Sequence, residues 1–337
     1  MRIETNKSLR QFNSFGLDHR AAFFTEVADE KELREALLAA RKAEVPAFIL
    51  GGGSNILLTK DLPFFVIKIN IKGIEILRED DKHVWVKVGA GEVWHDFVGY
   101  TIKKGWGGVE NLSLIPGTVG ASPMQNIGAY GVEIKDVFDH LEAIERKKGN
   151  LITFSGEDCG FGYRDSIFKQ KDKDKYVITR VVFRLDKFPV FNTTYGDIEL
   201  TMHELGFPEP SLEAVSEAII HIRSRKLPDP AVLGNAGSFF KNPVISPEKF
   251  HQLKANYPKL PGFTTTEGMK VPAAWLIEQA GWKGKRWGTI GVHAQQPLVL
   301  VNYGGGKGED LLFLSKSIAK DVFEKFGIAL QTEVNLI

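Results

Sequence analysis

Residues 111–131 read NLSLIPGTVGASPMQNIGAYG, and this stretch is the most informative part of the sequence. It contains no Lys, Arg or Asp, and its apolar residues are interspersed with glycines that leave the backbone bare. Because buried backbone N–H and C=O groups need hydrogen-bond partners, the segment must bond either to a cofactor rich in acceptor atoms or to the protein itself. The composition alone leaves two interpretations open, a ligand-binding loop and a buried crossover beneath other elements.

A second glycine-rich stretch lies upstream. Residues 47–58 read AFILGGGSNILL, a buried strand followed by a glycine turn. Consecutive N–H groups at such a turn suit a pyrophosphate. The turn is not a G-x-G-x-x-G fingerprint, since Ile56 stands at the third glycine position, and no Gly-Lys-Ser/Thr follows it. Each loop alone is a weak signal, but the two together favour one extended ligand that is held at two places.

The composition is that of an ordinary globular protein. The chain has 337 residues, of which 43% are hydrophobic, enough for two or three domains. Its 43 Lys and Arg balance 42 Asp and Glu, a net charge of +1 that disfavours nonspecific binding to nucleic acid or membrane surfaces. The N-terminus lacks an apolar signal-peptide core, and the single cysteine, Cys159, excludes an internal disulfide. We therefore expect a cytoplasmic protein with no membrane segment.

The first half of the chain changes from alternating elements to strands. In residues 22–70 we expect strands at 23–27, 46–50 and 64–69, a turn at 61–63, and a helix that Asp29 caps and that runs to Lys42. From 73 to 184 strands dominate, with one helix at 92–104 and a long loop at 111–131. The pattern predicts a parallel βαβ-like unit followed by a mainly antiparallel sheet that carries one helix.

The second half is predicted to be richer in helices. Residues 186–210 are expected to be irregular, and residues 234–243 to form a turn and a short strand. A closing strand over 328–336 would place Glu333 on the face opposite Val334. Apolar residues at helical spacing predict helices at 211–226, 246–256, 272–280 and 308–326.

Two familiar signatures are incomplete. Residues 303–310, YGGGKGED, resemble a phosphate loop, but Val301 replaces the first glycine and Gly308 replaces the Ser or Thr that holds magnesium. A turn before the last helix is the better interpretation. The eight histidines are scattered without HExxH spacing, so we expect no zinc site.

Three polar side chains could carry chemistry. Arg164, in the run GYRDS at 162–166, can face an anion, or it can form a surface salt bridge with Asp165. Ser238, which stands between a glycine and two phenylalanines, can relay a proton in a dry pocket, or it can be an ordinary strand serine. Glu333 can be a functional carboxylate or an outward-facing charge. Considered one by one, these residues favour the purely structural interpretations.

Taken together, the motifs resemble the UDP-N-acetylenolpyruvoylglucosamine reductase family, flavoenzymes that complete UDP-N-acetylmuramic acid in peptidoglycan synthesis. The resemblance runs from about Ser8 to Val334 through ILGGGSNILL, IPGTVGASPMQNIGAYGVEI, GYRDSIFK, TYGDI, RKLPDP and GNAGSFFKNP, in the family's order. The second and the last of these motifs are very specific. Tyr195, in TYGDI, is typical of the type I branch with its tyrosine loop. Asn335 departs from the pattern, because many relatives have a basic residue there.

The resemblance implies an α+β fold. A p-cresol-methylhydroxylase-type FAD-binding domain would have two parts, 1–70 and 71–210, and a smaller α+β substrate-binding domain would span 211–337, with its terminal strand 328–337 returning to the active site. The resemblance also implies noncovalent FAD and NADPH as co-substrate, and we expect a monomer. By residue match, Ser238 is the proton donor, Arg164 and Glu333 stabilise the intermediate, and the residues that contact the substrate diphosphate are Tyr195, Lys226 and Asn242. The positions assigned to FAD are Gly51, Gly53, Ser54, Asn55, Ile115, Pro116, Gly117, Ser122, Gly128 and Arg223.

The implied chemistry fits these residue types. After NADPH has reduced the flavin, flavin N5 would deliver hydride to the vinyl carbon distal to the ether oxygen, and negative charge would spread into the substrate carboxylate. Arg164 is a fixed cation suited to that charge, Glu333 can assist through a hydrogen-bond network, and Ser238 can supply the proton. The flavin performs the redox step while the protein positions and polarises the substrate.

Two other functions stay open on the residues alone. A flavin oxidase on the same scaffold would act on a sugar or hydroxy acid. Such enzymes often attach flavin through His or Cys, and residues 45–60 and 111–131 contain neither. A non-catalytic nucleotide-binding module would need none of Ser238, Arg164 and Glu333. Flavin binding and turnover distinguish the three.

Overall fold

The computed structural model describes the whole chain, residues 1–337, which divides into two compact units. Unit 1 comprises Met1–Lys7, Ala21–Gly52 and Pro63–Arg223. Unit 2 comprises Ser8–Arg20, Gly53–Leu62 and Ser224–Ile337. The division into three domains stays a prediction. None of the helices combines the length and the apolar character that a membrane span requires.

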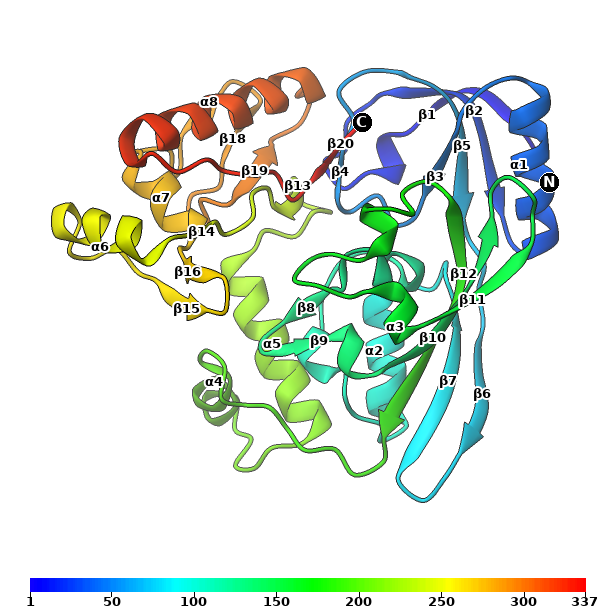
Figure 1. Cartoon of the computed structure of the whole chain (residues 1–337), viewed down its shortest axis with the longest axis horizontal. Coiled ribbons are helices and arrows are strands. Elements are labelled where there is room, and N and C mark those ends of the chain that lie inside the picture. Colours follow the sequence, from blue (N-terminus) through cyan, green and yellow to red (C-terminus); the bar gives the residue numbers. More distant parts are fainter. The chain divides into compact units, whose positions relative to one another are not determined.

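The first sheet of unit 1 has four strands and is accompanied by a helix (Figure 1). Helix α1, Glu30–Lys42, begins where the Asp29 carboxylate accepts the N–H of Glu32, as predicted. The predicted turn at 61–63 is wrong, because Leu62 is buried and begins a strand. The strands are β1 (Glu4–Ser8), β2 (Arg20–Val27), β3 (Ala47–Leu50) and β5 (Leu62–Ile69), in the order β1-β2-β5-β3. The parallel pairing of β3 with β5 confirms the parallel character expected here.

The second sheet of unit 1 has five antiparallel strands. In sheet order they are β11 (Leu151–Ser155), β10 (Phe138–Glu145), β12 (Tyr176–Asp186), β7 (His83–Gly89) and β6 (Ile74–Glu79). Helix α2, Trp94–Lys103, packs on this sheet (Figure 1), with the Phe97 and Phe183 ring centroids 5.0 Å apart. The predicted antiparallel sheet with one helix is confirmed.

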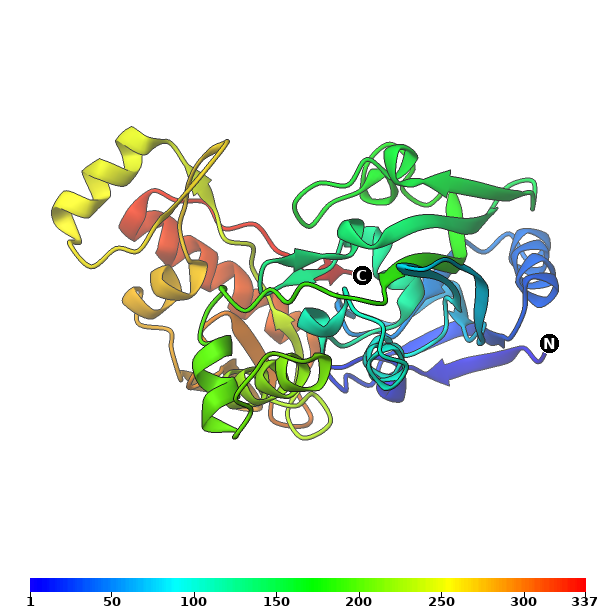
Figure 2. The ribbon, with the colours of Figure 1, turned by 90° about the horizontal axis from the view of Figure 1, so that it is seen from below.

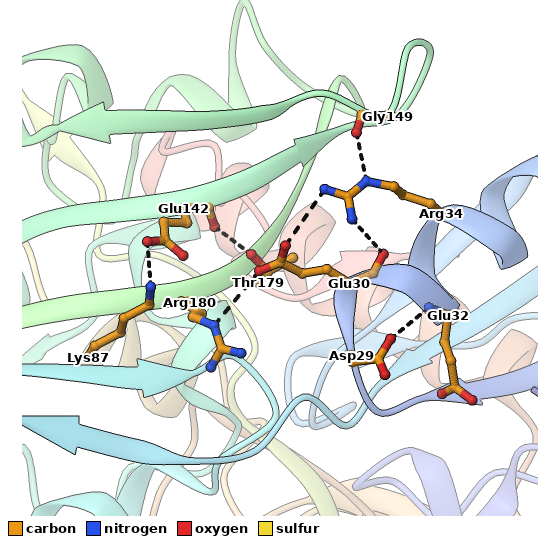
Figure 3. Close-up of polar contacts among 9 residues, drawn as sticks. All are labelled: Asp29, Glu30, Glu32, Arg34, Lys87, Glu142, Gly149, Thr179 and Arg180. Carbon is orange, nitrogen blue, oxygen red and sulfur yellow. Dashed lines mark hydrogen bonds and ion pairs between the residues drawn. The ribbon is translucent and has the colours of Figure 1, made fainter.

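Helix α1 also connects the two sheets of unit 1 (Figure 3). The Nε atom of Arg34 donates to the carbonyl of Gly149 over 2.9 Å, and Arg180 of β12 lies 3.8 Å from the carboxylate of Glu30. Ile144 of β10 shares a buried apolar cluster with α1 and the first sheet. Because partly exposed ion pairs contribute little to stability, the apolar contact supplies most of this attachment.

The stretch 111–131 is not an open loop. It folds into 3-10 turns at Glu110–Leu112, Val119–Ala121 and Pro123–Gln125 and enters the short strand pair β8 (Gly128–Ala129) and β9 (Val132–Glu133). The remaining short helices of the chain are Arg10–Phe12, Ile134–Asp136, α3 (Gly156–Cys159) and Ile167–Lys169.

The stretch 186–210, predicted to be irregular, contains a helix. Helix α4, Ile198–Glu204, buries Ile198 and Met202 in one cluster with residues of α5, Leu212–Lys226. These two apolar residues lie only one turn apart, so they give no periodic signal in the sequence. The predicted helix at 211–226 is confirmed by α5.

Unit 2 contains a four-stranded sheet, a three-stranded sheet and three helices. The larger sheet has the order β13 (Gly234–Ser238), β19 (Val299–Asn302), β18 (Ile290–Val292) and β17 (Arg286–Trp287). The smaller has the order β14 (Val244–Ile245), β16 (Gly268–Lys270) and β15 (Phe263–Thr265). The helices confirm the predictions and are α6 (Pro247–Asn256), α7 (Ala273–Gln279) and α8 (Gly308–Phe326). Helix α8 packs against α7 and β18, and α6 lies beside β16 (Figures 1 and 2).

The C-terminal segment of unit 2 differs from the predicted strand over 328–336. Only β20, Asn335–Leu336, is a strand, and it pairs in parallel with β4, Ile56–Leu57. Upstream, the Glu333 N–H donates to the Phe239 carbonyl over 2.8 Å, and the Lys241 N–H donates to the Gln331 carbonyl over 2.9 Å. These two bonds form an isolated antiparallel bridge between Phe240 and Thr332, which does not continue into a strand ladder.

Candidate functional site

The two glycine-rich stretches adjoin within unit 1. A Cβ atom added at Gly52 would lie 2.8 Å from the Cα of Gly117, and one added at Gly51 would lie 3.1 Å from Thr118 Oγ1. Only glycine allows two backbones to approach this closely. Residues 51–52 and 117–118 therefore form adjacent stretches of backbone, an arrangement suited to a phosphate-rich cofactor.

Position 53 requires glycine for a different reason, which is its contact with the protein itself. Its φ is +66°, and a Cβ atom there would lie 1.9 Å from the carbonyl oxygen of Phe12, within unit 2. The Ser14 N–H donates to the Gly53 carbonyl over 3.0 Å. A larger residue at position 53 would thus clash with the protein itself, whether or not a ligand is bound.

Part of the backbone in 111–131 is bonded to the protein. The Trp94 N–H donates to the Gly117 carbonyl over 3.0 Å, and the Val119 N–H donates to the Glu92 carbonyl over 2.9 Å. The hydroxyl of Ser122 donates to the Val119 carbonyl over 2.7 Å, so toward a ligand it would act as an acceptor. The buried-crossover interpretation of this stretch is therefore partly correct, and it does not compete with ligand binding.

Seven non-glycine residues of unit 1 adopt left-handed backbone, and four of them lie between residues 111 and 164: Leu114 (φ +58°), Asn126 (+42°), Tyr130 (+50°) and Arg164 (+54°). Such conformations cost about 1–3 kcal/mol each and persist where the surroundings enforce them. The Asn126 side chain supplies one such contact, because its Nδ2 donates over 3.0 Å to the carbonyl of Gly162. That bond ties the 111–131 stretch to the turn that carries Arg164.

Arg164, Arg223 and Tyr130 form an electrostatic cluster in unit 1. Burial lowers the pKa of Arg223, and the positive charge of Arg164 lowers it further. Burial raises the pKa of the Tyr130 phenol, although the Arg223 cation opposes that shift. The Nε atom of Arg223 is buried without a hydrogen-bond partner. Two neighbouring cations, one with an unsatisfied donor, suit an anionic or acceptor-rich ligand.

Tyr195 lies against the same part of unit 1. Its ring centroid is 6.3 Å from that of Tyr130, edge-on at 89°, and the residue is 60% exposed. The Asn111 Nδ2 donates to the carbonyls of Tyr130 and Asn192 over 3.1 and 2.8 Å. At Gly131 a Cβ atom would lie 2.8 Å from the Asn192 side chain. The backbone before Tyr195 is therefore anchored while much of the residue remains accessible to a ligand.

Unit 2 brings Ser238, Glu333 and Asn55 into one neighbourhood. Ser238 ends β13, and the carbonyl of the next residue, Phe239, accepts the Glu333 N–H over 2.8 Å. The Asn55 Nδ2 donates to the Glu333 carbonyl over 3.4 Å, and the Asn55 carbonyl accepts the Asn335 N–H over 3.1 Å. Three candidates that are far apart in the sequence thus converge through backbone bonds.

The other candidates of unit 2 lie on regular elements or beside them. Ser238 is half-buried, and the two phenylalanines that follow it are almost fully buried. Asn242 Oδ1 accepts the Ala273 N–H over 2.9 Å, so the group that it can offer a ligand is Nδ2. Lys226 is exposed at the end of α5.

Three residues of these regions were not predicted from the sequence: Tyr130, Asn111 and Asn126. An aromatic residue between glycines in GAYG was a signal for Tyr130.

The predicted candidates are divided between the two units. Unit 1 contains Gly51, Ile115, Pro116, Gly117, Ser122, Gly128, Arg164, Tyr195 and Arg223. Unit 2 contains Gly53, Ser54, Asn55, Lys226, Ser238, Asn242 and Glu333.

Two family models match the chain. One, described as an FAD binding domain, matches residues 21–155, and the other, described as the C-terminal domain of UDP-N-acetylenolpyruvoylglucosamine reductase, matches residues 229–337. The first match confirms the predicted FAD-binding domain, and the mixed helices and strands of the structure confirm the α+β class.

Whole-length relatives agree with these matches. The chain is 51% identical over 339 residues to a UDP-N-acetylenolpyruvoylglucosamine reductase of Flavobacterium johnsoniae, with 100% of each sequence covered. It is 49% identical to that of Pseudomonas fluorescens, with 99% of each covered. The crystal structure of the Thermus caldophilus reductase matches with a TM-score of 0.68 at 25% identity, covering 100% of this chain and 99% of that one. The chain therefore belongs to the UDP-N-acetylenolpyruvoylglucosamine reductase family.

Proposed function

We propose that this FAD-containing oxidoreductase reduces the enolpyruvyl ether of UDP-N-acetylglucosamine to UDP-N-acetylmuramate with NADPH, in the cytoplasm and as a monomer. The observation that carries the proposal is the pairing, in one chain, of an FAD binding domain at 21–155 with the C-terminal domain of the reductase at 229–337. The product is a peptidoglycan precursor. A flavin oxidase of another substrate class is less well supported, because the C-terminal match names the reductase.

The residues of unit 1 fit a bound FAD. The adjacent backbones at Gly52 and Gly117 leave no room for side chains, which suits close approach by a pyrophosphate. The buried, unpartnered Nε of Arg223 can be satisfied by an acceptor on the cofactor. We assign the cofactor contacts of unit 1 to Gly51, Ile115, Pro116, Gly117, Ser122, Gly128 and Arg223. The family resemblance adds Gly53, Ser54 and Asn55, which belong to unit 2.

Bound FAD would supply the hydride chemistry, accepting from NADPH and giving to the enol ether. Residues of the chain would then stabilise the developing negative charge and supply the proton. Arg164 would hold the substrate carboxylate as negative charge develops on the adjacent carbon, because a fixed guanidinium needs no reorganisation. Ser238 would donate its proton to that carbon, and Glu333 would support the charge through hydrogen bonds. Tyr195, Lys226 and Asn242 would hold the diphosphate.

The FAD is proposed to be noncovalent. Residues 45–60 and 111–131 contain no His or Cys that could form a bond to flavin. The single cysteine, Cys159, is buried, and burial raises its pKa to about 12, so its reactive thiolate is scarce. Acid denaturation should release all yellow colour into the supernatant. Colour that stays with the precipitated chain would contradict this assignment.

The test of the reaction is a product assay. Incubation with NADPH and the enol ether should consume the two in equal amounts and give a product heavier by two hydrogens, since a hydride and a proton are added. NADPH should not be consumed at this rate without the enol ether. If the enol ether is recovered unchanged while NADPH is oxidised, the substrate assignment is wrong.

A further inference from the structure

The first turn of α2 holds the proposed flavin segment 115–117 from both ends. Downstream, the Trp94 N–H donates to the Gly117 carbonyl over 3.0 Å. Upstream, the Trp94 Nε1 donates to the Leu112 carbonyl over 2.9 Å, and the Leu114 N–H donates to Nδ1 of His95 over 3.0 Å. The bond to His95 adjoins the segment directly, because Leu114 precedes Ile115.

Leu114 has an unfavourable backbone conformation. Its φ is +58°, and a left-handed conformation costs a residue with a Cβ atom about 1–2 kcal/mol relative to the right-handed one. The direction in which 115–117 leaves Leu114 depends on this φ, since φ and ψ are the only soft torsions of the backbone. The His95 bond fixes the peptide plane before Leu114, and the Trp94 bond fixes the plane after Gly117. Because both planes are held by the same helix turn, the two bonds together restrict φ of Leu114 and the path of 115–117.

The hydrogen bond from Leu114 indicates which nitrogen of the His95 ring carries the proton. An imidazole nitrogen that accepts an N–H carries no proton, so the ring is neutral and its proton lies on Nε2. His95 is half-buried on α2, whose neighbours Trp94 and Phe97 are fully buried in the core of unit 1. The ring is thus attached to a rigid helix and can act as a fixed acceptor.

We propose that His95 is a positioning residue for the cofactor: by accepting the Leu114 N–H it holds the peptide plane before Leu114 and, with the Trp94 bond to Gly117, keeps Leu114 in its left-handed conformation and so presents 115–117 to the flavin. The proposal rests on the proposed function only in assigning Ile115, Pro116 and Gly117 to the flavin. His95 acts through the backbone and need not touch the cofactor.

Three substitutions at position 95 test the acceptor. His95→Asn keeps an acceptor, since Asn Oδ1 is as many bonds from Cβ as His Nδ1. His95→Gln moves the acceptor one bond outward, and His95→Ala removes it. In the refilled holoenzyme, the FAD dissociation constant should rise roughly tenfold for His95→Ala, which corresponds to the loss of one hydrogen bond. It should rise similarly for His95→Gln and stay close to that of the parent for His95→Asn.

A second substitution removes the strain itself. Glycine adopts positive φ without penalty, so adding Leu114→Gly to His95→Ala should recover FAD affinity. Leu114→Gly alone should change the FAD dissociation constant less than His95→Ala does. Comparing the parent, the two single variants and the double variant in a double-mutant cycle separates backbone strain at Leu114 from lost side-chain packing. The visible spectrum of the bound flavin should shift in His95→Ala and return in the double variant.

The outcomes distinguish the inference from the reductase proposal. If His95→Asn binds FAD as weakly as His95→Ala, or if Leu114→Gly recovers nothing, His95 does not act through the Leu114 N–H and the inference is overturned. If all variants bind FAD like the parent while their melting temperatures fall, His95 has only a structural role. Failure of the reductase proposal would appear instead as a parent protein that binds FAD but makes no product.

Discussion

Unit 1 and unit 2 position their candidate residues by different means. In unit 1 most candidates lie on loops and short turns, although Arg223 lies on α5 and Gly128 on β8. Glycines there approach other backbone within contact distance, and Leu114 and Arg164 hold positive φ. In unit 2 Ser238 ends a strand, and Glu333 is fixed by a backbone bond beside it. We therefore expect backbone shape to matter most in the glycine-rich segments of unit 1, and side-chain chemistry to matter most at Ser238 and Glu333 in unit 2. Backbone changes should therefore affect flavin binding, and side-chain changes in unit 2 should affect chemistry.

The largest effect should come from Ser238→Ala in unit 2. A positioned general acid contributes about 10²–10⁴-fold, so reoxidation of the flavin by the enol ether should slow by that factor. FAD content and reduction by NADPH should stay near those of the parent, because the proton is needed only afterwards. Anaerobic stopped-flow measurement of both half-reactions checks this.

Ser238→Cys is the matched variant, since a thiol also carries a proton, and it should recover part of the rate. Equal slowing of both half-reactions in Ser238→Ala would mean that Ser238 affects the flavin itself and not only the proton transfer, and the comparison between the units would fail. If the rate of flavin reoxidation is unchanged in Ser238→Ala, Ser238 has only a structural role.

The next effect is expected for Gly52→Val in unit 1. The added side chain would meet the backbone of Gly117, where a Cβ atom alone lies 2.8 Å from Cα, and overpacking of this kind costs about 1–3 kcal/mol. The variant should purify with little FAD and a lowered melting temperature. The amount of FAD per chain, measured after denaturation, tests the prediction. A stoichiometric FAD content would show that the two adjoining loops are not part of the cofactor site.

Tyr195→Phe should have a smaller effect that is confined to the substrate. Losing one hydroxyl opposite a charged diphosphate costs roughly 1–3 kcal/mol, so KM for the enol ether should rise about tenfold or more. Reduction by NADPH should hardly change. Tyr176→Phe, in β12, is the control and should leave KM unaltered. A Tyr195→Phe variant with parental KM would place the diphosphate elsewhere.

Gly99→Ala should have the smallest effect on function. Gly99 lies inside α2, and a Cβ atom there would meet nothing within 4 Å. Alanine in a helix interior is favoured over glycine by about 1 kcal/mol, so thermal stability should rise slightly. FAD content should match that of the parent, which thermal unfolding and absorbance can establish together. Loss of both FAD and thermal stability here would show that flavin binding responds to general destabilisation of unit 1, and Gly52→Val would then not test the cofactor site.

Local patterns predicted the regular elements well. The apolar residues of α8 repeat at helical spacing, and the predicted range 308–326 matches Gly308–Phe326. α4 was missed because two apolar residues one turn apart form no repeat. The strand predicted at 328–336 is reduced to a single bridge at Thr332 and the two residues of β20, because these positions pair with different segments, Phe240 and β4.

Long-range contacts explain what the sequence could not reveal about the site. The meeting of Asn55 with Glu333 depends on the pairing of β4 with β20, two short strands without a periodic signal. Gly53 was assigned to FAD by residue match, but the contact that requires glycine there is with the protein, because a Cβ atom would lie 1.9 Å from the Phe12 carbonyl oxygen. The residues themselves could be selected by family resemblance, but the physical reason for each needed the structure.

The most direct measurement is the visible spectrum of the purified protein, recorded without oxygen before and after NADPH and again after the enol ether. We expect a flavin spectrum at one FAD per chain, bleaching by one equivalent of NADPH, and full recovery on addition of one equivalent of the enol ether. A colourless protein that cannot be refilled with FAD would contradict the assignment of unit 1. A flavin that bleaches but does not recover with the enol ether would contradict the proposed reaction.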